Sequence, residues 1–93
     1  MRRIDRTRNF KRDYRRIKAT PRYRNIDTLL AGIVGLLAND QLLPAANRDH
    51  VLTGNWIGLR ECHVRPDLLL VYDKPGPDVL ILTRLGSHSE LFG

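Results

Sequence analysis

The spacing of apolar residues changes halfway along this chain, and the change limits the folds that the chain can adopt. In the first half, apolar residues recur every three or four positions with charged residues between them, which is the period of a helix. In the second half, three runs rich in β-forming residues follow one another, 57–64, 68–72 and 79–85. A helical half followed by a stranded half predicts an α+β fold, with the helices on one face of a sheet.

Two helices are predicted in the first half. The first begins after Thr7 as its N-cap and ends before Thr20-Pro21. The second uses Thr20 as its cap and Pro21 in its first turn, and it ends at Asn39-Asp40. Its apolar stripe consists of Tyr23, Ile26, Leu30, Ile33 and Leu37. A connection of about four residues predicts that the two helices form an antiparallel hairpin.

The three stranded runs are separated by two turn sequences, 65–67 and 73–78, which are rich in Pro, Asp and Gly. Such turns predict an antiparallel meander. Residues 2–5 are compatible with a short additional strand at the edge of this sheet. If the helical hairpin covers one face of the sheet, the other face stays partly open, and we expect the functional site there.

Length and composition predict a single small domain over residues 1–93. Cys62 is the only cysteine, which excludes an internal disulfide and an all-cysteine metal site. The longest apolar run, 29–38, has about half the length that a bilayer crossing needs. No signal-peptide pattern is present at the N-terminus. We therefore expect a cytoplasmic protein that does not contact a membrane.

Positive charge is concentrated in the first quarter of the chain. Residues 1–24 carry a local net charge of +9, whereas residues 25–93 carry −3. A basic segment of this density suits RNA or an acidic protein partner, although a solvated helix face would have the same composition.

All three histidines, His50, His63 and His88, fall in the second half. Strand alternation places Glu61 and His63 on one face, which we assign to the open side of the sheet. Asp67 follows His63 by four residues, close enough to orient an imidazole. Taken singly, each of these residues is more often an ordinary surface side chain than a functional one.

Two other site types are poorly supported. The gaps of 13 and 25 residues between the histidines match no common zinc-ligand spacing, so no metal and no cofactor are predicted. Ser87 lacks the tight nucleophile-elbow context of a catalytic serine.

Four short motifs occur in order along the second half and the C-terminus: "DH" at 49–50, "LTGNWIG" at 52–58, "HVRPD" at 63–67 with Tyr72 after it, and "GSHSELFG" at 86–93. In order and spacing they resemble the YafQ branch of the RelE superfamily, the toxins of bacterial type II toxin–antitoxin pairs. The resemblance spans the whole chain and implies a RelE-like fold. It also implies a ribosome-dependent endoribonuclease that cuts messenger RNA in the decoding site.

The resemblance further implies roles for single residues. His50, His63, Asp67 and His88 match the acid–base positions of the family, and Phe92 matches its terminal aromatic residue. Arg84 matches a basic residue at the end of a strand, so Arg84 and Phe92 are expected to bind substrate. The implied partners are a cognate antitoxin with an acidic segment and mRNA on the ribosome.

These residue types suit metal-independent cleavage of RNA, in which the 2′-OH attacks the neighbouring phosphate. The reaction needs a general base and a general acid, and histidine supplies both forms at neutral pH. We predict His88 as the acid and either His50 or His63 as the base, with Asp67 orienting one of these two imidazoles. Leu91 would dock on the sheet and hold His88 in place.

Two alternatives without catalysis remain open from the sequence. One is a basic RNA- or ribosome-binding module in which the histidines are incidental. The other is a DNA-binding regulator, for which the predicted helices lack a clear helix-turn-helix spacing.

Overall fold

Five strands form one sheet in the computed structural model of the chain, which describes all residues from 1 to 93. Their order across the sheet is β1-β5-β4-β3-β2. Strands β2 to β5 pair antiparallel in sequence order, which confirms the predicted meander, whereas β1 joins the edge of β5 in parallel. The bounds are Arg3–Arg6 for β1, His50–Val51 for β2, Arg60–Arg65 for β3, Leu68–Asp73 for β4 and Val79–Gly86 for β5.

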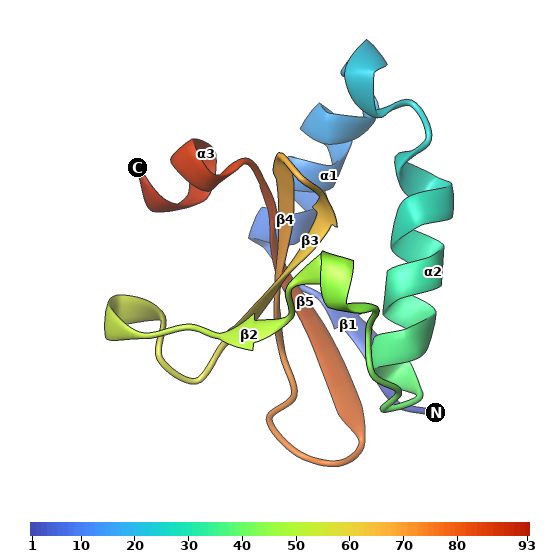
Figure 1. The fold of residues 1–93 in the computed structure, drawn as a ribbon, viewed down its shortest axis with the longest axis vertical. Helices are drawn as coiled ribbons and strands as arrows, with labels where there is room; N and C mark the ends of the chain where they lie inside the picture. Colours follow the sequence, from blue (N-terminus) through green and yellow to red (C-terminus); the bar gives the residue numbers. More distant parts are fainter.

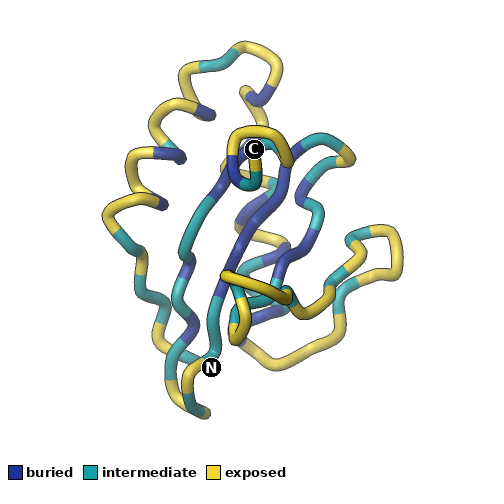
Figure 2. The backbone as a smooth tube through the Cα atoms, turned by 90° about the vertical axis from the view of Figure 1, so that its left-hand side faces the viewer, coloured by how far each residue is buried: buried dark blue, intermediate teal, exposed yellow.

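Helices α1 (Arg8–Lys18) and α2 (Ile26–Ala38) cover one face of the sheet, and the short helix α3 (His88–Phe92) lies on the other face (Figure 1). The main core lies between the first two helices and the sheet, where the central strands are buried along most of their length (Figure 2). This arrangement confirms the predicted α+β fold. No helix in the structure combines the length and the apolar character that a membrane crossing requires.

The first helix begins and ends as its sequence predicts. The Thr7 side chain accepts a hydrogen bond from the Phe10 amide at 3.0 Å, so Thr7 is the N-cap. The predicted start of the second helix is wrong. The Thr20 hydroxyl donates to the Arg16 carbonyl at 2.9 Å instead of capping a new helix, and residues 21–23 form a separate 3-10 turn. Helix α2 therefore begins at Ile26, while the predicted apolar stripe is buried as expected.

The first stranded run is also shorter than predicted. Residues 54–56 form a 3-10 turn, and Gly58 has a φ of 93°, a backbone conformation that favours glycine. The chain therefore turns before β3, which starts at Arg60, and Ile57 is left 79% exposed. Strand β2 and helix α3 were not predicted, because elements of two and five residues carry too little periodicity to be recognised.

Helix α1 takes the place of a neighbouring strand along the second half of β5. Strand β1 ends opposite Leu82. Beyond it, the Thr7 amide donates to the Leu82 carbonyl at 3.0 Å, and the Thr7 hydroxyl donates to the Thr83 carbonyl at 2.7 Å. The Asp13 carboxylate accepts from the Leu85 amide at 3.0 Å. These contacts satisfy edge groups of β5 that would otherwise lack partners, and they fix α1 against this strand.

The C-terminal residues are ordered because α3 is capped and docked. Ser87 and Glu90 form a capping box, in which the Ser87 hydroxyl accepts from the Glu90 amide and the Glu90 carboxylate accepts from the Ser87 amide. Leu91 is 7% exposed and packs on Leu69 and Val71, as predicted. Helix α3 thus covers part of the face that was expected to be open, and the histidines lie beside it.

Candidate active site

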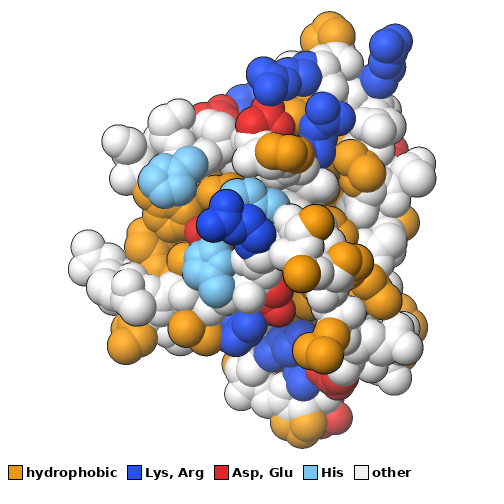
Figure 3. All heavy atoms as spheres, viewed as in Figure 1, with side chains coloured by type: hydrophobic (Ala, Val, Ile, Leu, Met, Phe, Trp, Pro, Cys, Tyr) orange, Lys and Arg blue, Asp and Glu red, His pale blue; other side chains and the backbone are white.

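A cavity of about 220 Å³ opens on the face of the sheet that carries α3. Its walls come from β2, β3, the 52–56 loop and α3. All three histidines of the chain lie on this side of the molecule, around one basic side chain (Figure 3). The residues that line the cavity are His50, Leu52, Thr53, Trp56, Glu61, His88 and Phe92. The fold therefore brings together His50, His88 and Phe92, three of the residues predicted from the sequence.

A buried carboxylate lies between two of the histidines. His50 and Glu61 face each other across the β2–β3 pair, and strand alternation puts Glu61 and His63 on the same face. Glu61 Oε1 is 3.8 Å from His50 Nε2 and 4.0 Å from His63 Nε2. The Glu61 side chain is only 7% exposed and makes no hydrogen bond within the protein. Glu61 is therefore the carboxylate that faces both imidazoles.

The two imidazoles are oriented by backbone carbonyl groups. His50 Nδ1 lies 2.7 Å from the Arg48 carbonyl, and His63 Nδ1 lies 3.3 Å from the Pro66 carbonyl. A carbonyl oxygen only accepts, so each Nδ1 carries the proton in these contacts. In the neutral form each Nε2 is then an acceptor and lies near Glu61, and of the two rings only that of His50 lines the cavity. Either histidine is therefore arranged to take a proton at Nε2.

Asp49, the residue before His50, anchors the loop that leads into β2. The Tyr72 hydroxyl donates to Asp49 Oδ1 at 2.5 Å, and Arg60 pairs with Asp49 Oδ2 at 3.3 Å. Tyr72 is almost completely buried, and burial together with the Asp49 carboxylate raises the pKa of this phenol. The phenol therefore stays protonated as a donor. The "DH" motif and the later tyrosine act together to hold His50 at the edge of the cavity.

The expected contact between Asp67 and a histidine does not form, so this part of the prediction is wrong. Asp67 accepts a hydrogen bond from the Tyr23 hydroxyl at 2.7 Å and pairs with Arg22 at 2.5 Å. The hydrogen bond from Tyr23 holds the pKa of Asp67 below its ordinary value. Asp67 therefore points to the helical side of the β3–β4 turn, and the carboxylate between the imidazoles is Glu61.

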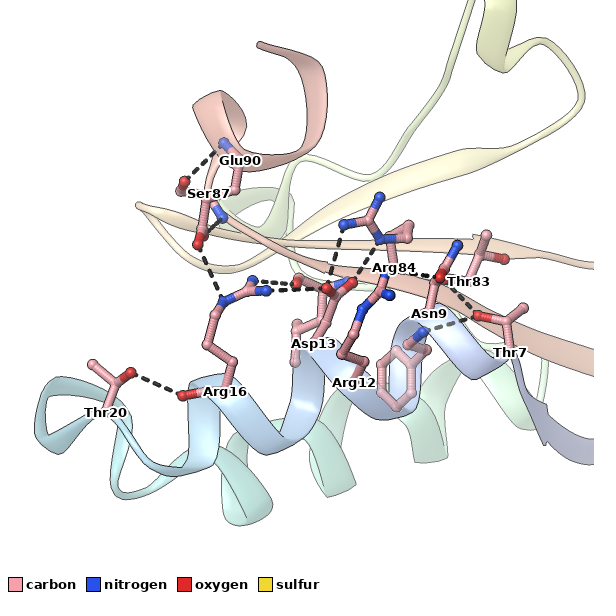
Figure 4. A network of polar contacts seen from close by, with 12 residues as sticks. Thr7, Asn9, Arg12, Asp13, Arg16, Thr20, Thr83, Arg84, Ser87 and Glu90 are labelled. Atoms are coloured by element: carbon pink, nitrogen blue, oxygen red, sulfur yellow. Dashed lines mark hydrogen bonds and ion pairs between the residues drawn. The ribbon is translucent and has the colours of Figure 1, made fainter.

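Arg84 does not line the cavity, because its guanidinium group is held by α1. Arg84 Nε donates to Asp13 Oδ2 at 2.6 Å, and Nη2 donates to Oδ1 at 3.3 Å (Figure 4). Asp13 is fully buried and also accepts from the Leu85 amide. The positive charge of Arg84 is therefore already paired within the protein.

Phe92 lies between an aromatic side chain and a histidine. Its ring packs edge-on against Trp56 with 5.0 Å between centroids, and its centroid is 5.2 Å from that of His88. Phe92 is half-buried, whereas His88, the first residue of α3, is exposed. Trp56 thus supports the residues at the C-terminus.

Sequence reasoning did not assign a role to Glu61 or Trp56. The signals were present, since Glu61 shares a strand face with His63 and Trp56 stands within a recognised motif. Their significance depends on contacts with β2 and α3, two elements that are too short to predict.

The comparison with protein families agrees with this site and fold. Residues 2–93 match the family model described as the bacterial toxin of type II toxin–antitoxin system, YafQ. The chain belongs to the YafQ family. This membership confirms the resemblance that the four motifs carry, and it makes the protein a toxin of the type II class.

Several YafQ-family proteins are closely similar to this chain. The mRNA interferase toxin YafQ of Escherichia coli strain K12 is 39% identical over 75 residues, which cover 81% of this chain and 80% of that protein. Its name agrees with the predicted class of enzyme. The crystal structure of the E. coli DinJ–YafQ toxin–antitoxin complex contains a chain with 33% identity and a TM-score of 0.84, with 99% of this chain and 98% of that chain covered.

A metal-bound toxin from Helicobacter pylori is 41% identical, with a TM-score of 0.84 and coverage of 99% of this chain and 100% of that one. In the present structure, no group of three or more His, Cys, Asp or Glu side chains has an arrangement that could hold a metal ion. The donor set therefore does not fit a resident metal, and the mechanism derived below uses side chains alone.

Proposed function

We propose that this YafQ-family toxin is an endoribonuclease that cleaves mRNA on the ribosome and thereby stops translation in the cytoplasm. The proposal rests on two histidine Nε2 atoms that lie 3.8 and 4.0 Å from the buried carboxylate of Glu61. Glu61 and His50 line the cavity together with His88. Cleavage of RNA by its own 2′-OH needs one group that takes a proton and another that gives one. Histidines on two sides of a shallow cavity suit this chemistry.

In the proposed mechanism, Nε2 of His50 or His63 takes the proton of the 2′-OH. The imidazolium ion that forms is stabilised by Glu61, which has no other partner in the protein. The 2′-oxygen attacks the adjacent phosphorus, the bond to the 5′-oxygen breaks, and His88 on α3 donates a proton to that leaving oxygen. Each well-placed proton transfer contributes about 10²–10⁴-fold to the rate.

Asp67 takes an indirect role in this proposal, whereas Arg84 takes a direct one. The ion pair and hydrogen bond of Asp67 hold the β3–β4 turn, and the carbonyl of Pro66 in this turn orients His63. Arg84 retains a partly exposed guanidinium group, with 23% of the side chain accessible, that could contact substrate phosphate from the edge of the site. Phe92 is placed to stack on a base, a contact worth about 1–3 kcal/mol.

The shape and charge of the molecule support the proposed dependence on the ribosome. A cavity of about 220 Å³ does not enclose an RNA strand, so the message must be held in line by another body. Helix α1 exposes several basic side chains of the +9 segment, which suit the phosphate backbone of ribosomal RNA.

We further propose that a cognate antitoxin neutralises the toxin through an acidic amphipathic helix. A groove of about 490 Å³ runs between α1 and α2. Its floor is mainly apolar and includes Phe10, Leu30 and Val34, while Lys11 and Arg15 stand on its rim. An acidic helix with one apolar face complements such a groove in both shape and charge. The DinJ–YafQ complex shows that a related toxin binds an antitoxin.

The experiment that tests the enzyme is an assay of mRNA cleavage on translating ribosomes with purified protein. Wild-type protein should cut the message, and His88→Ala should bind ribosomes equally well but cut about 10²–10⁴ times more slowly. Equal binding without any cleavage by the wild type would favour the alternative, a non-catalytic ribosome-binding module. Rapid cutting of free RNA at the same sites would contradict the proposed dependence on the ribosome.

A further inference from the structure

A chain of polar contacts runs from the buried side of α1 to the helix that carries His88 (Figure 4). It begins at Asp13, whose carboxylate is fully buried and accepts from Arg84, from the Leu85 amide and from Arg16. Burial works against the charged form, but the hydrogen bonds from Arg84 and Leu85 hold the pKa of Asp13 below its ordinary value. Asp13 is therefore a charged anchor at the end of β5.

Arg16 links this anchor to α3. Its Nη1 lies 3.2 Å from Asp13 Oδ1, its Nη2 donates to the Leu85 carbonyl at 3.4 Å, and its Nε lies 3.2 Å from Glu90 Oε2. The other oxygen of Glu90 accepts from the Ser87 amide at 2.8 Å and completes the capping box of α3. One guanidinium group thus contacts α1, β5 and α3 at the same time.

Little free space separates the Arg16–Glu90 pair from the backbone at Gly86. A Cβ atom at Gly86 would lie 3.2 Å from Glu90 Oε1, 3.2 Å from Leu91 Cδ2 and 3.3 Å from Arg16 Nη2. The backbone at the start of α3 is therefore in close contact with the Arg16–Glu90 pair. His88 follows Gly86 by two residues and is the first residue of the helix.

We propose that Arg16, anchored by Asp13, is a positioning residue that sets the orientation of α3 and so the placement of His88 and Phe92 over the cavity. This proposal rests on the proposed function. A helix of five residues has no stable orientation of its own, so its direction depends on the contacts that dock it. Leu91 packs on the sheet and Phe92 packs on Trp56, and the Arg16–Glu90 pair adds a polar contact that limits rotation of α3 about these apolar contacts.

A role in stability alone does not account for this arrangement. Both members of the Arg16–Glu90 pair are more than 40% exposed, and exposed ion pairs contribute little to the stability of a fold. Placement of two reacting groups to within about an ångström affects the reaction rate far more strongly than it affects the stability of the fold.

The test compares Arg16→Gln and Glu90→Gln with wild-type protein. Glutamine at position 90 can still accept from the Ser87 amide, so the capping box is kept and only the ion pair is lost. Arg24→Gln is the matched control, because it removes the same charge at an exposed residue that lies outside α1 and forms no ion pair in the structure. The readouts are the melting temperature, the emission of Trp56, and cleavage on saturating ribosomes. Trp56 is the only tryptophan and contacts Phe92, so its emission reports the placement of α3.

We expect both variants to melt close to the wild type, to shift the emission of Trp56, and to cut about tenfold more slowly than the wild type or Arg24→Gln. Arg16→Gln lowers the net charge and Glu90→Gln raises it. A general effect of charge on ribosome binding would therefore change the cleavage rates of the two variants in opposite directions. The double variant should be no slower than Arg16→Gln alone, because both substitutions remove the Arg16–Glu90 pair.

Wild-type emission together with wild-type cleavage in Arg16→Gln and Glu90→Gln would overturn the proposal, as would equal effects in Arg24→Gln. The emission readout separates this result from a failure of the proposed function. If the wild-type protein does not cut mRNA, the emission shift still decides whether Arg16 positions α3.

Discussion

Glu61 Oε1 lies 3.8 Å from Nε2 of His50, the residue directly opposite it across the β2–β3 pair. The carboxylate is buried and the imidazole is half exposed, so the pair spans the boundary between the protein interior and the cavity. Proton uptake at His50 would place a positive charge next to a carboxylate whose only other near partner is the His63 imidazole. This relationship makes Glu61 the first residue to test after the histidines.

Glu61→Gln should slow cleavage by about 10–100-fold, because the amide cannot stabilise an imidazolium ion by charge. The substitution keeps the size of the side chain, so the melting temperature should change little. Single-turnover cleavage on ribosomes measures the effect, with Asp5→Asn as a control that removes a carboxylate from the far edge of the sheet. A Glu61→Gln protein with full activity would show that neither imidazole depends on this carboxylate.

Asp13→Asn should destabilise the fold by about 3 kcal/mol at neutral pH, because Arg84 then lacks its charged partner. The pKa of Asp13 is lowered in the folded state, so its contribution is complete above the ordinary value of 3.8 and is lost as the pH falls below that value. Urea unfolding of both proteins between pH 7 and pH 2.5 measures this difference. A difference in the free energy of unfolding that stays constant over this range would contradict the assignment.

Leu91→Ala and Phe92→Ala should separate docking of α3 from the chemistry of the site. Leu91 is buried, so its truncation should cost about 2–3 kcal/mol. Phe92 is half-buried and loses mainly its contact with Trp56, which should cost about 1 kcal/mol. Thermal unfolding measures both values. If Phe92 stacks on a base, Phe92→Ala should lose growth arrest although most of the protein remains folded, and activity in proportion to the folded fraction would exclude stacking.

Ala31→Glu should weaken binding of the antitoxin by at least about tenfold, because it places a carboxylate on the wall of the α1–α2 groove, where an acidic helix would repel it. Ala31 is exposed and far from the histidines, so toxicity without antitoxin should persist. Co-expression with the antitoxin measures neutralisation, and Ala46→Glu, an exposed site outside the groove, is the matched control. Neutralisation of Ala31→Glu at the wild-type antitoxin dose would place the antitoxin on another surface.

The sequence by itself determined the helices, the three long strands and the family. The period of apolar residues is a local property, so α1, α2 and the meander could be predicted from neighbours along the chain. The motifs around His50, His63, His88 and Phe92 could also be recognised from the sequence, because the residues of each motif stand close together in the chain.

The tertiary structure decided which carboxylate faces the imidazoles. Asp67 follows His63 by four residues and was expected to orient an imidazole, but the turn directs it towards Tyr23. Strand register instead brings Glu61 between two histidines from different strands. The pairing of Arg84 with Asp13 and the bridge from Arg16 to Glu90 were equally hidden, because they join residues far apart in the chain. Long-range contacts of this kind depend on how the helices and strands pack against each other. The local spacing of residues in the sequence does not predict that packing.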